Sequence, residues 1–337
     1  MKAFIINTYN KKGILQQAEV PFPEIKDNDI LVEVHAAGVN LLDSKIKSGE
    51  FKLILPYKLP LILGHDVAGI IVKVGRNVKK FKAGDEIYAR AADHRIGTFA
   101  EFIAIDQNDA ALKPKNLSME EAASIPLVAL TAWQALVEKA KVRKGQKVFI
   151  QAGSGGVGTI AIQLAKHLGA VVATTASTKS FALLKNLGAD ILIDYKTNDF
   201  EHILKDYDAV LNSQDKKTLE KSLNVLKPGG QLISISGPPT PEFAKEAGLP
   251  WYIRTIISLL SLGVRNKAQK KHIHYSFLFM RAQGAQLQEI TTLIESDVLK
   301  PVIDKVFDFE QANDALEYVE SGRAKGKVVI QVKSSRS

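Results

Sequence analysis

The stretch Gln151-Ala152-Gly153-Ser154-Gly155-Gly156-Val157-Gly158 contains a complete Gly-x-Gly-x-x-Gly pattern. It follows the β-branched and apolar run 147–150, and it precedes apolar residues that recur at helical spacing from 160 to 168. The order is therefore a strand, a tight turn and a helix. Glycines let such a turn approach a pyrophosphate, which free N–H groups and the positive end of the helix dipole stabilise. In this context the motif predicts a dinucleotide-binding unit rather than a turn without a ligand.

The composition limits the classes to which the protein can belong. The chain has 337 residues, which favours two domains, and 46% of them are hydrophobic, which suffices for real cores. Cysteine is absent, which excludes disulfides, zinc–thiolate sites and thiol nucleophiles and fits a cytoplasmic protein. The first residues lack the apolar region of a signal peptide, and no window reaches the roughly 18 uninterrupted apolar residues of a membrane-spanning helix. The net charge of +9 is spread along the chain, so nucleic-acid binding is not expected.

The pattern of apolar residues changes along the chain. Residues 1–121 alternate short apolar runs with turn residues, which is typical of an irregular β-rich domain. Strand-like and helix-like runs then alternate, with strands expected at 148–152, 170–174, 191–194, 209–212, 231–236 and 273–279. We therefore predict an α/β protein in which a doubly wound parallel sheet is joined to a β-rich domain.

The end of the second predicted strand bears on the choice of cofactor. NAD-binding units carry an acidic residue there, which accepts hydrogen bonds from the ribose 2′-hydroxyl group. Here the segment is Thr174-Thr175-Ala176-Ser177-Thr178-Lys179, which has no carboxylate. A hydroxyl group and a lysine suit a 2′-phosphate, so Ser177 and Lys179 predict NADPH in preference to NADH. Ser177 alternatively caps the helix expected from Thr178, and the two roles are compatible.

The segment 238–271, between the last two predicted strands, has two interpretations. It contains a mostly apolar helical run from Trp251 to Val264, which is followed by Arg265, Lys267, Lys270 and Lys271. The simpler interpretation is a helix that covers the sheet. Because an apolar face beside basic residues also suits the surface of a bilayer, peripheral membrane contact is the alternative.

Four stretches together resemble the medium-chain dehydrogenase/reductase superfamily. They are the glycine turn, Gly-Val-Asn-Leu-Leu-Asp-Ser-Lys at 38–45, Gly-His-Asp-Val-Ala-Gly at 64–69 and Gly-Arg-Ala-Lys-Gly-Lys-Val-Val at 322–329. The match extends over nearly the whole chain, and Ala-Gly-Ser-Gly-Gly-Val-Gly at 152–158 resembles the zinc-free quinone oxidoreductase and enone reductase branch. The resemblance implies a GroES-like catalytic domain built from residues 1–121 and 283–337. It also implies a central Rossmann domain at 122–282 that binds NADPH, and a homodimer.

Zinc alcohol dehydrogenases of the same superfamily are the main competing class. By resemblance, their catalytic metal is bound by a cysteine after Gly-Val, by the histidine of Gly-His-Glu and by a later cysteine or acid. Asn40 stands at the first of these positions, and Asp66 replaces the glutamate. His65 alone does not complete a site that needs three protein ligands. We therefore expect no metal site, and we interpret His65 as a packed or hydrogen-bonded turn residue.

The resemblance also implies roles for individual residues. It assigns Asn40 to the nicotinamide and its ribose, and Tyr195 to the adenosine 2′-phosphate. The alternatives are turn chemistry for Asn40 and a packed aromatic at a strand end for Tyr195. Further cofactor contacts are expected from the glycine turn, the segment after the fifth strand and the C-terminal basic turn, namely Gly153, Ser154, Gly155, Gly156, Val157, Gly158, Ser236, Gly237, Lys325 and Lys327.

The implied reaction transfers a hydride to the activated double bond of an enone, or to a quinone. Hydride transfer needs little from side chains, because the cofactor carries the hydride and the protein orients it. Negative charge builds on the carbonyl oxygen of an enone, so a nearby donor should stabilise it. Lys45 is the candidate donor, and it stands where quinone reductases often have tyrosine, which favours enones. The alternative is a surface lysine paired with Asp43.

The expected substrate is a small apolar carbonyl compound or a quinone. Two other functions stay open at this point. One is an alcohol or aldehyde dehydrogenase, and the other is a non-enzymatic NADPH-binding protein that uses its basic surface on RNA or a membrane.

Overall fold

The computed structural model describes residues 1–333, and the chain forms two compact units. Unit 1 comprises Met1–Leu130 and Arg281–Ser337, and unit 2 comprises Thr131–Met280. The two ends of the chain therefore share one unit, while the middle of the chain forms the other.

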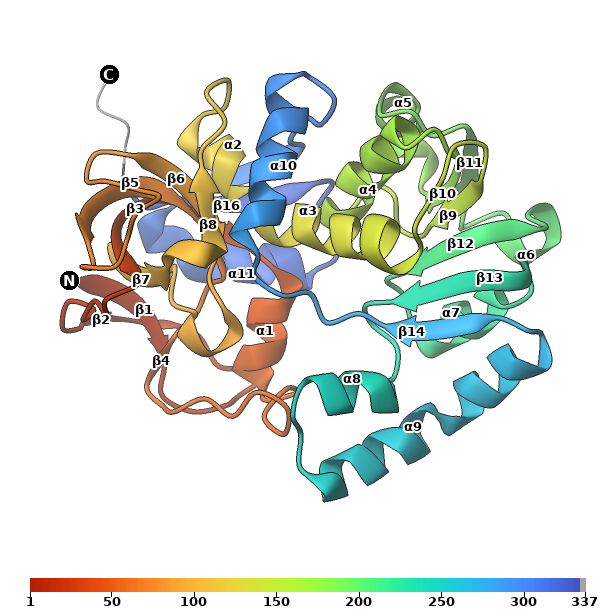
Figure 1. Cartoon of the computed structure of the whole chain (residues 1–337), viewed down its shortest axis with the longest axis horizontal. Coiled ribbons are helices and arrows are strands. Elements are labelled where there is room, and N and C mark those ends of the chain that lie inside the picture. The colour runs from red at the N-terminus through yellow and green to blue at the C-terminus, as the bar shows by residue number, and fades with distance from the viewer. Residues whose placement is uncertain (334–337) are drawn as a thin grey trace. The chain divides into compact units, whose positions relative to one another are not determined.

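Unit 2 is built on a six-stranded parallel sheet of order β11-β10-β9-β12-β13-β14 (Figure 1). Its strands are β9 (Lys147–Ile150), β10 (Val171–Ala176), β11 (Ile191–Asp194), β12 (Tyr207–Asn212), β13 (Leu226–Ser234) and β14 (His274–Phe277). The predicted fold class, a doubly wound parallel sheet with a β-rich domain, is confirmed. The strand order reverses between β9 and β12, and in such sheets ligands bind outside the carboxyl ends of the strands at this switch point.

Helices cover both faces of this sheet. Right-handed crossovers place α4 (Gly156–His167) and α5 (Phe181–Asn186) on one face, and α6 (Phe200–Ile203) and α7 (Lys216–Ser222) on the other. Strands covered on both faces need apolar residues throughout, and Phe149, Val210 and Leu232 are accordingly fully buried. Two strands start at least two residues earlier than predicted: β12 begins at Tyr207 rather than 209, and β13 begins at Leu226 rather than 231, with an irregular register opposite Tyr207 and Ala209.

Two further helices of unit 2 lie between β13 and β14. They are α8 (Pro241–Glu246) and α9 (Trp251–Lys270), and α9 is longer than the apolar run that predicted it. In the described part of the chain, no helix is long and apolar enough to cross a membrane.

Unit 1 contains a sheet of order β15-β16-β3-β5-β6-β8, with β7 paired to β3, and a smaller sheet of order β2-β1-β4. Strand β3 pairs with β7 along its first half and with β16 along its second, with Val39 opposite Val328. The C-terminal strand thus completes a sheet made by the N-terminal segment. The strands are β1 (Lys2–Ile6), β2 (Gln16–Glu19), β3 (Asp29–Val39), β4 (Leu61–Ile62), β5 (Asp66–Val74), β6 (Glu86–Arg90), β7 (Phe102–Asp106), β8 (Ala110–Leu112), β15 (Ile303–Asp308) and β16 (Lys327–Gln331).

Short helices complete unit 1 around one apolar core that includes Phe4, Ile30, Ile87 and Phe307. The α-helices are α1 (Leu41–Ser48), α2 (Met119–Ala123), α10 (Gly284–Glu295) and α11 (Ala312–Glu320), and α3 (Pro126–Trp133) runs from unit 1 into unit 2. Helix α1 begins directly after β3, so the residue between them, Asn40, is the N-cap of the helix.

Candidate functional site

The glycine turn joins β9 to α4 at the switch point of the unit 2 sheet. A Cβ atom on Gly153 would lie 2.2 Å from Thr174 Oγ1, and one on Gly158 would lie 2.5 Å from the Ala152 carbonyl oxygen. At Gly155, the N-cap of α4, an added Cβ would meet only the Ala152 carbonyl oxygen, at 3.4 Å. Packing therefore requires Gly153 and Gly158, whereas the space beside Gly155 is open at the helix N-terminus, where a phosphate is stabilised.

The exposure of the residues in the glycine turn separates the same two groups. Gly153 and Gly158 are buried, and the residues between them, Ser154, Gly155, Gly156 and Val157, are partly exposed. These four residues therefore form the part of the turn that a ligand can reach.

Three residues assigned to the adenosine end of the cofactor follow neighbouring strands. Strands β10 and β11 are parallel, with Ala176 opposite Asp194, so the residues after them emerge at the same edge of the sheet. Lys179 and Tyr195 are exposed there, and Ser177 is partly buried. Ser177 occupies the N-cap of a short 3-10 helix, but its side chain makes no capping hydrogen bond to the described residues that follow.

A chain of uncharged polar side chains crosses the switch point. Asn212, the last residue of β12, donates to Gln151 Oε1 at 2.6 Å and accepts from Ser234 Oγ at 2.6 Å. Gln151 in turn donates to Ser222 Oγ at 2.6 Å. All four residues are buried, and they tie together the carboxyl ends of β9, β12 and β13. Sequence reasoning missed Gln151 and Asn212; an amide directly after a buried apolar strand was the available signal.

Ser236 and Gly237, two predicted cofactor contacts, are linked by hydrogen bonds to this network of polar side chains. Ser236 Oγ donates to the Gln214 carbonyl oxygen at 2.6 Å, and Gly237 N donates to Ser234 Oγ at 2.8 Å. Their donors are therefore engaged within unit 2.

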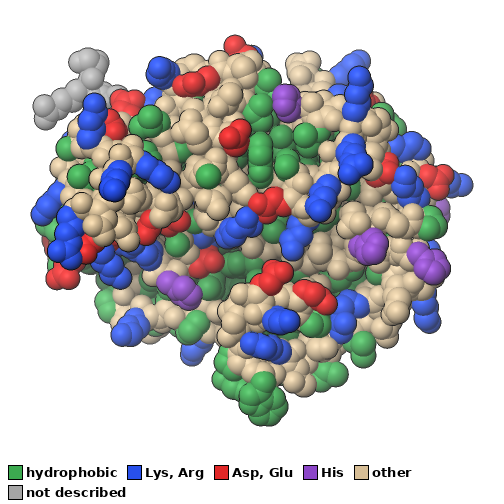
Figure 2. Space-filling model, in the orientation of Figure 1, with side chains coloured by type: hydrophobic (Ala, Val, Ile, Leu, Met, Phe, Trp, Pro, Cys, Tyr) green, Lys and Arg blue, Asp and Glu red, His purple; other side chains and the backbone are tan. Residues whose placement is uncertain are grey.

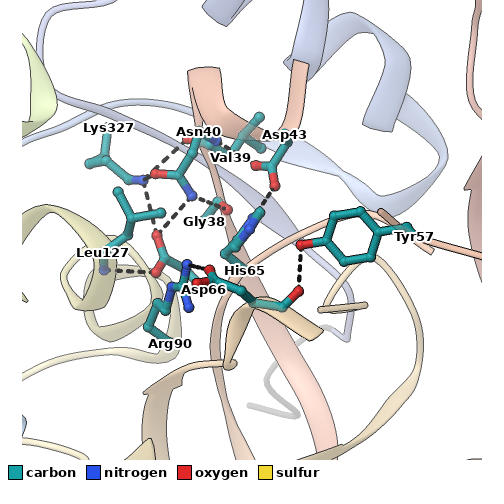
Figure 3. A network of polar contacts seen from close by, with 11 residues as sticks. Gly38, Val39, Asn40, Asp43, Tyr57, His65, Asp66, Arg90, Leu127 and Lys327 are labelled. Carbon is teal, nitrogen blue, oxygen red and sulfur yellow. Dashed lines mark hydrogen bonds and ion pairs between the residues drawn. The ribbon is translucent and has the colours of Figure 1, made fainter. Parts of the chain in front are cut away.

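A second candidate region lies in unit 1 around Asp66, the first residue of β5 (Figure 3). Asp66 is 0% exposed, and Lys327, the first residue of β16, is 5% exposed. Lys327 Nζ lies 3.2 Å from Asp66 Oδ2, and it donates to Asn40 Oδ1 at 2.5 Å. It also donates to the Val39 carbonyl oxygen at 3.1 Å. Asn40 Nδ2 donates to Asp66 Oδ2 at 3.0 Å, and Leu127 N donates to Asp66 Oδ1 at 2.8 Å.

This arrangement balances a buried charge and orients an amide. A carboxylate removed from water is costly unless it is paired and hydrogen-bonded, and Lys327 supplies the opposite charge. The Asn40 amide faces an ammonium group with its oxygen and a carboxylate with its nitrogen, so its orientation is determined by the network. Asn40 therefore does more than begin α1.

Asp43 connects this network to His65. Asp43 Oδ2 accepts from Asn40 N at 2.8 Å, and Asp43 Oδ1 lies 2.6 Å from His65 Nδ1 (Figure 3). Both side chains are 0% exposed. In a neutral ring that donates through Nδ1, Nε2 is an acceptor, and within residues 1–333 this buried atom has no hydrogen-bond partner.

The alternative interpretation of Lys45, a pair with Asp43, is wrong. The oxygens of Asp43 face His65 and Asn40, and the residue is fully buried. Residues two positions apart on a helix point in different directions, and Lys45 is partly exposed on α1. Its ammonium forms no ion pair or hydrogen bond with the side chains and backbone that the structure describes.

The two lysines of the C-terminal turn have different environments. Lys325 is exposed, whereas Lys327 is buried with Asn40 and Asp66. The sequence placed both at the cofactor, and the Lys327 ammonium group here contacts Asn40, Asp66 and the Val39 carbonyl oxygen.

Apart from His65 Nε2, the potential metal-ligand atoms of this region are already engaged. His65 Nδ1 contacts Asp43, and Asp66 contacts Lys327. In the described residues, one group of side chains has spacing that suits a metal ion, namely Asp199, Glu201 and His202 in unit 2. The Lys221 ammonium group pairs with both of those carboxylates, at 3.1 Å from Glu201 Oε1.

Comparisons with known proteins agree on one class. The "Alcohol dehydrogenase GroES-like domain" family model matches residues 26–115, and the "Zinc-binding dehydrogenase" model matches residues 187–330. The chain is 37% identical over 341 residues to 2-methylene-furan-3-one reductase of Solanum lycopersicum. It is 34% identical over 341 residues to the chloroplastic NADPH-dependent alkenal/one oxidoreductase of Arabidopsis thaliana. Each alignment covers 98% of this chain and 79% of the relative.

A solved structure shows the same fold over the whole chain. The Escherichia coli quinone oxidoreductase complexed with NADPH superposes with a TM-score of 0.82 at 27% sequence identity. The match covers 98% of this chain and 100% of that chain.

We expect substitution of the packed Gly158 to lower stability and substitution of the open Gly155 to weaken ligand binding. Gly158→Ala should lower the free energy of unfolding by about 1–3 kcal/mol, because the new Cβ would overlap the Ala152 carbonyl oxygen. Gly155→Ala should leave stability within about 1 kcal/mol and weaken dinucleotide binding. Urea denaturation and fluorescence titration with NADPH measure the two effects. Equal loss of stability in both variants would contradict the distinction between the glycine that packing requires and the glycine beside open space.

Removing the buried ammonium group should expose the cost of the Asp66 charge. Lys327→Met should lower the free energy of unfolding by about 3–5 kcal/mol, because it leaves a buried carboxylate without a counter-charge. Adding Asp66→Asn should recover part of that loss in a double-mutant cycle monitored by urea denaturation.

The matched control is the exposed ion pair between Arg76 and Asp27. Arg76→Ala should change the free energy of unfolding by less than about 1 kcal/mol. If the Lys327 variant behaves like the Arg76 variant, Lys327 does not balance a buried charge.

Proposed function

Because this chain belongs to the quinone oxidoreductase and enone reductase branch of the medium-chain dehydrogenase/reductase superfamily, we propose that it is a zinc-independent, NADPH-dependent reductase. Its substrates are small enones or quinones. The observation that carries the proposal is the buried network of Asp66, Lys327 and Asn40. In this network the Lys327 ammonium group balances the Asp66 carboxylate, which lies beside the residues at the first two positions of the zinc-ligand pattern. The names of the two relatives and of the NADPH-bound structure support the reaction class.

Zinc independence is supported by the state of the donor atoms of Asn40 and Asp66. A catalytic zinc ion takes three protein ligands from cysteine, histidine or carboxylate groups. Asn40 offers an amide in place of a thiolate, and its oxygen already accepts from Lys327. The Asp66 carboxylate has three donors, and a cation placed beside it would meet the Lys327 ammonium group.

Preference for NADPH is supported by the end of β10 and by the glycine turn. No carboxylate stands among Ser177, Thr178 and Lys179, where an NAD-binding unit would carry one. The Ser177 hydroxyl and the exposed Lys179 ammonium suit a 2′-phosphate, and Tyr195 lies at the same edge of the sheet. The open space beside Gly155 leaves room for a pyrophosphate to approach the turn. The cofactor, when bound, supplies the hydride.

The proposed roles in catalysis fall to residues of α1 and its N-cap. Asn40 would hold the nicotinamide ribose through an amide whose orientation the network fixes. Lys45 donates to the substrate carbonyl oxygen as negative charge develops there, and its partly exposed ammonium group makes no competing ion pair within residues 1–333. Water supplies the proton to the α-carbon. A homodimer and a cytoplasmic location stay predictions.

The decisive experiment follows NADPH oxidation by chelator-treated protein with a short-chain enone. We expect turnover with the enone and none with a simple saturated ketone. Lys45→Ala should lower kcat/KM by about 100-fold if one donor to the carbonyl oxygen is lost. Lys52→Ala, an exposed lysine beyond the same helix, is the matched control and should retain full activity.

A different experimental result would contradict each part of the proposal. Activity that returns only when zinc is added back would refute zinc independence. Reduction of the saturated ketone by the treated protein would favour an alcohol or aldehyde dehydrogenase. Cofactor binding without turnover on any enone or quinone would leave the non-enzymatic function.

The cofactor preference has its own test. Lys179→Ala should raise the KM for NADPH by about 10- to 100-fold, because a hydrogen bond to a charged group is lost. The KM for NADH should stay unchanged, since NADH lacks the 2′-phosphate. Lys185→Ala, on α5, serves as the control for general loss of positive charge. Equal losses for both cofactors would refute the role of Lys179.

A further inference from the structure

Helix α9 carries an apolar surface that the fold of unit 2 does not use. We call it the outward face of α9, and it consists of Trp251, Tyr252, Ile256, Leu259, Leu260 and Leu262. These side chains are between 44% and 78% exposed. In Figure 2, hydrophobic side chains project at the foot of the view, where α8 and α9 lie in Figure 1.

The opposite face of the same helix accounts for its packing. Ile253, Ile257, Ser261, Val264 and Ala268 are buried, and they recur at the spacing of a single helical face. The exposed positions 252, 256, 259 and 263 recur at the same spacing on the other side. A helix that only covers the sheet needs one apolar face, so the second, exposed face is available for a further contact.

The charge around this helix favours an anionic partner. From Ala247 to Gln288 the chain contains no Asp or Glu, whereas it contains Arg254, Arg265, Lys267, Lys270, Lys271 and Arg281. Lys267 pairs with Glu220 of α7, but Lys270 and Lys271 are exposed at the end of α9. Lys270 lies on the same side of the helix as Tyr252 and Leu259. The acidic side chains closest in sequence are Glu242 and Glu246 of α8.

We propose that the outward face of α9 binds the surface of an anionic lipid bilayer. The helix would lie parallel to the surface, with its leucines and isoleucine at the boundary of the acyl chains and Lys270 and Lys271 at the phosphates. Trp251 and Tyr252, at the other end, suit the interface between headgroups and acyl chains. A second copy of this chain is the less suitable occupant, because it would bring the same basic segments together. The proposal is independent of the reductase activity.

The test is co-sedimentation of the full-length protein with vesicles. Phosphatidylcholine vesicles with about one third phosphatidylglycerol should bind the protein, and pure phosphatidylcholine vesicles should bind it far less. Binding should weaken in about 0.5 M salt, which screens the charges. Trp251 emission should shift to shorter wavelength on binding, and Trp251→Phe should reduce that shift while the protein still sediments with the vesicles.

Two double variants separate the apolar and the charged contributions. Leu259→Gln with Leu260→Gln should lower the partition coefficient by about tenfold or more, because apolar burial is lost. Lys270→Gln with Lys271→Gln should lower it by about fivefold per charge. Ile14→Gln with Leu53→Gln, both exposed in unit 1, is the matched control and should bind as the wild type does. All variants should keep reductase activity and thermal unfolding close to wild type.

Three results would overturn the proposal. The first is a wild-type protein that does not bind the anionic vesicles. The second is equal loss of binding in the α9 variants and in the unit 1 control. The third is a change of oligomeric state in the α9 variants, seen by light scattering, with vesicle binding unchanged, which would assign the face to a second copy.

Discussion

The charge of Asp66, a carboxylate without access to water, constrains how the two ends of the chain meet in unit 1. It draws one hydrogen-bond donor from each of three places, namely the first residue of β16, the N-cap of α1 and the start of α3. Lys327 reaches it only if β16 pairs with β3 in the observed register, because a slip of one residue would turn the ammonium group to the other face of the sheet. The pairing of the two chain ends and the orientation of Asn40 thus depend on the same ionic contact.

In unit 2, hydrogen bonds between uncharged side chains position the candidate site. The residues at its switch point carry no net charge: Gln151, Asn212, Ser222 and Ser234 hydrogen-bond to one another and fix the ends of three strands. Backbone N–H groups at the start of a helix such as α4 suit a phosphate group. Unit 1 therefore contains a fixed network of charged and polar side chains, and unit 2 contains a backbone turn whose flanking strand ends are fixed.

Much of unit 2 could be predicted from the sequence, because glycine spacing and runs of apolar residues are local signals. All six strands were expected, and the start of β13 was missed because Pro228-Gly229-Gly230 is typical of a turn. The environment of Lys327 was not predictable, since a lysine in a basic turn is normally solvated and its burial depends on a strand pairing with a distant part of the chain. The pairing of Asp43 failed for a related reason: its partner, His65, is far away in the sequence, whereas the neighbouring Lys45 points elsewhere.

The position of Lys327 near the C-terminus also sets an order for biosynthesis. Asn40 and Asp66 leave the ribosome early, all of unit 2 follows, and Lys327 emerges only afterwards. Unit 2 is continuous in the chain, so it can fold during translation. Until β16 arrives, Asp66 lacks the Lys327 ammonium group that balances its charge, so we expect unit 1 to close last. A nascent chain that stops before Lys327 therefore exposes an incomplete sheet to proteases, even though its dinucleotide-binding unit is finished.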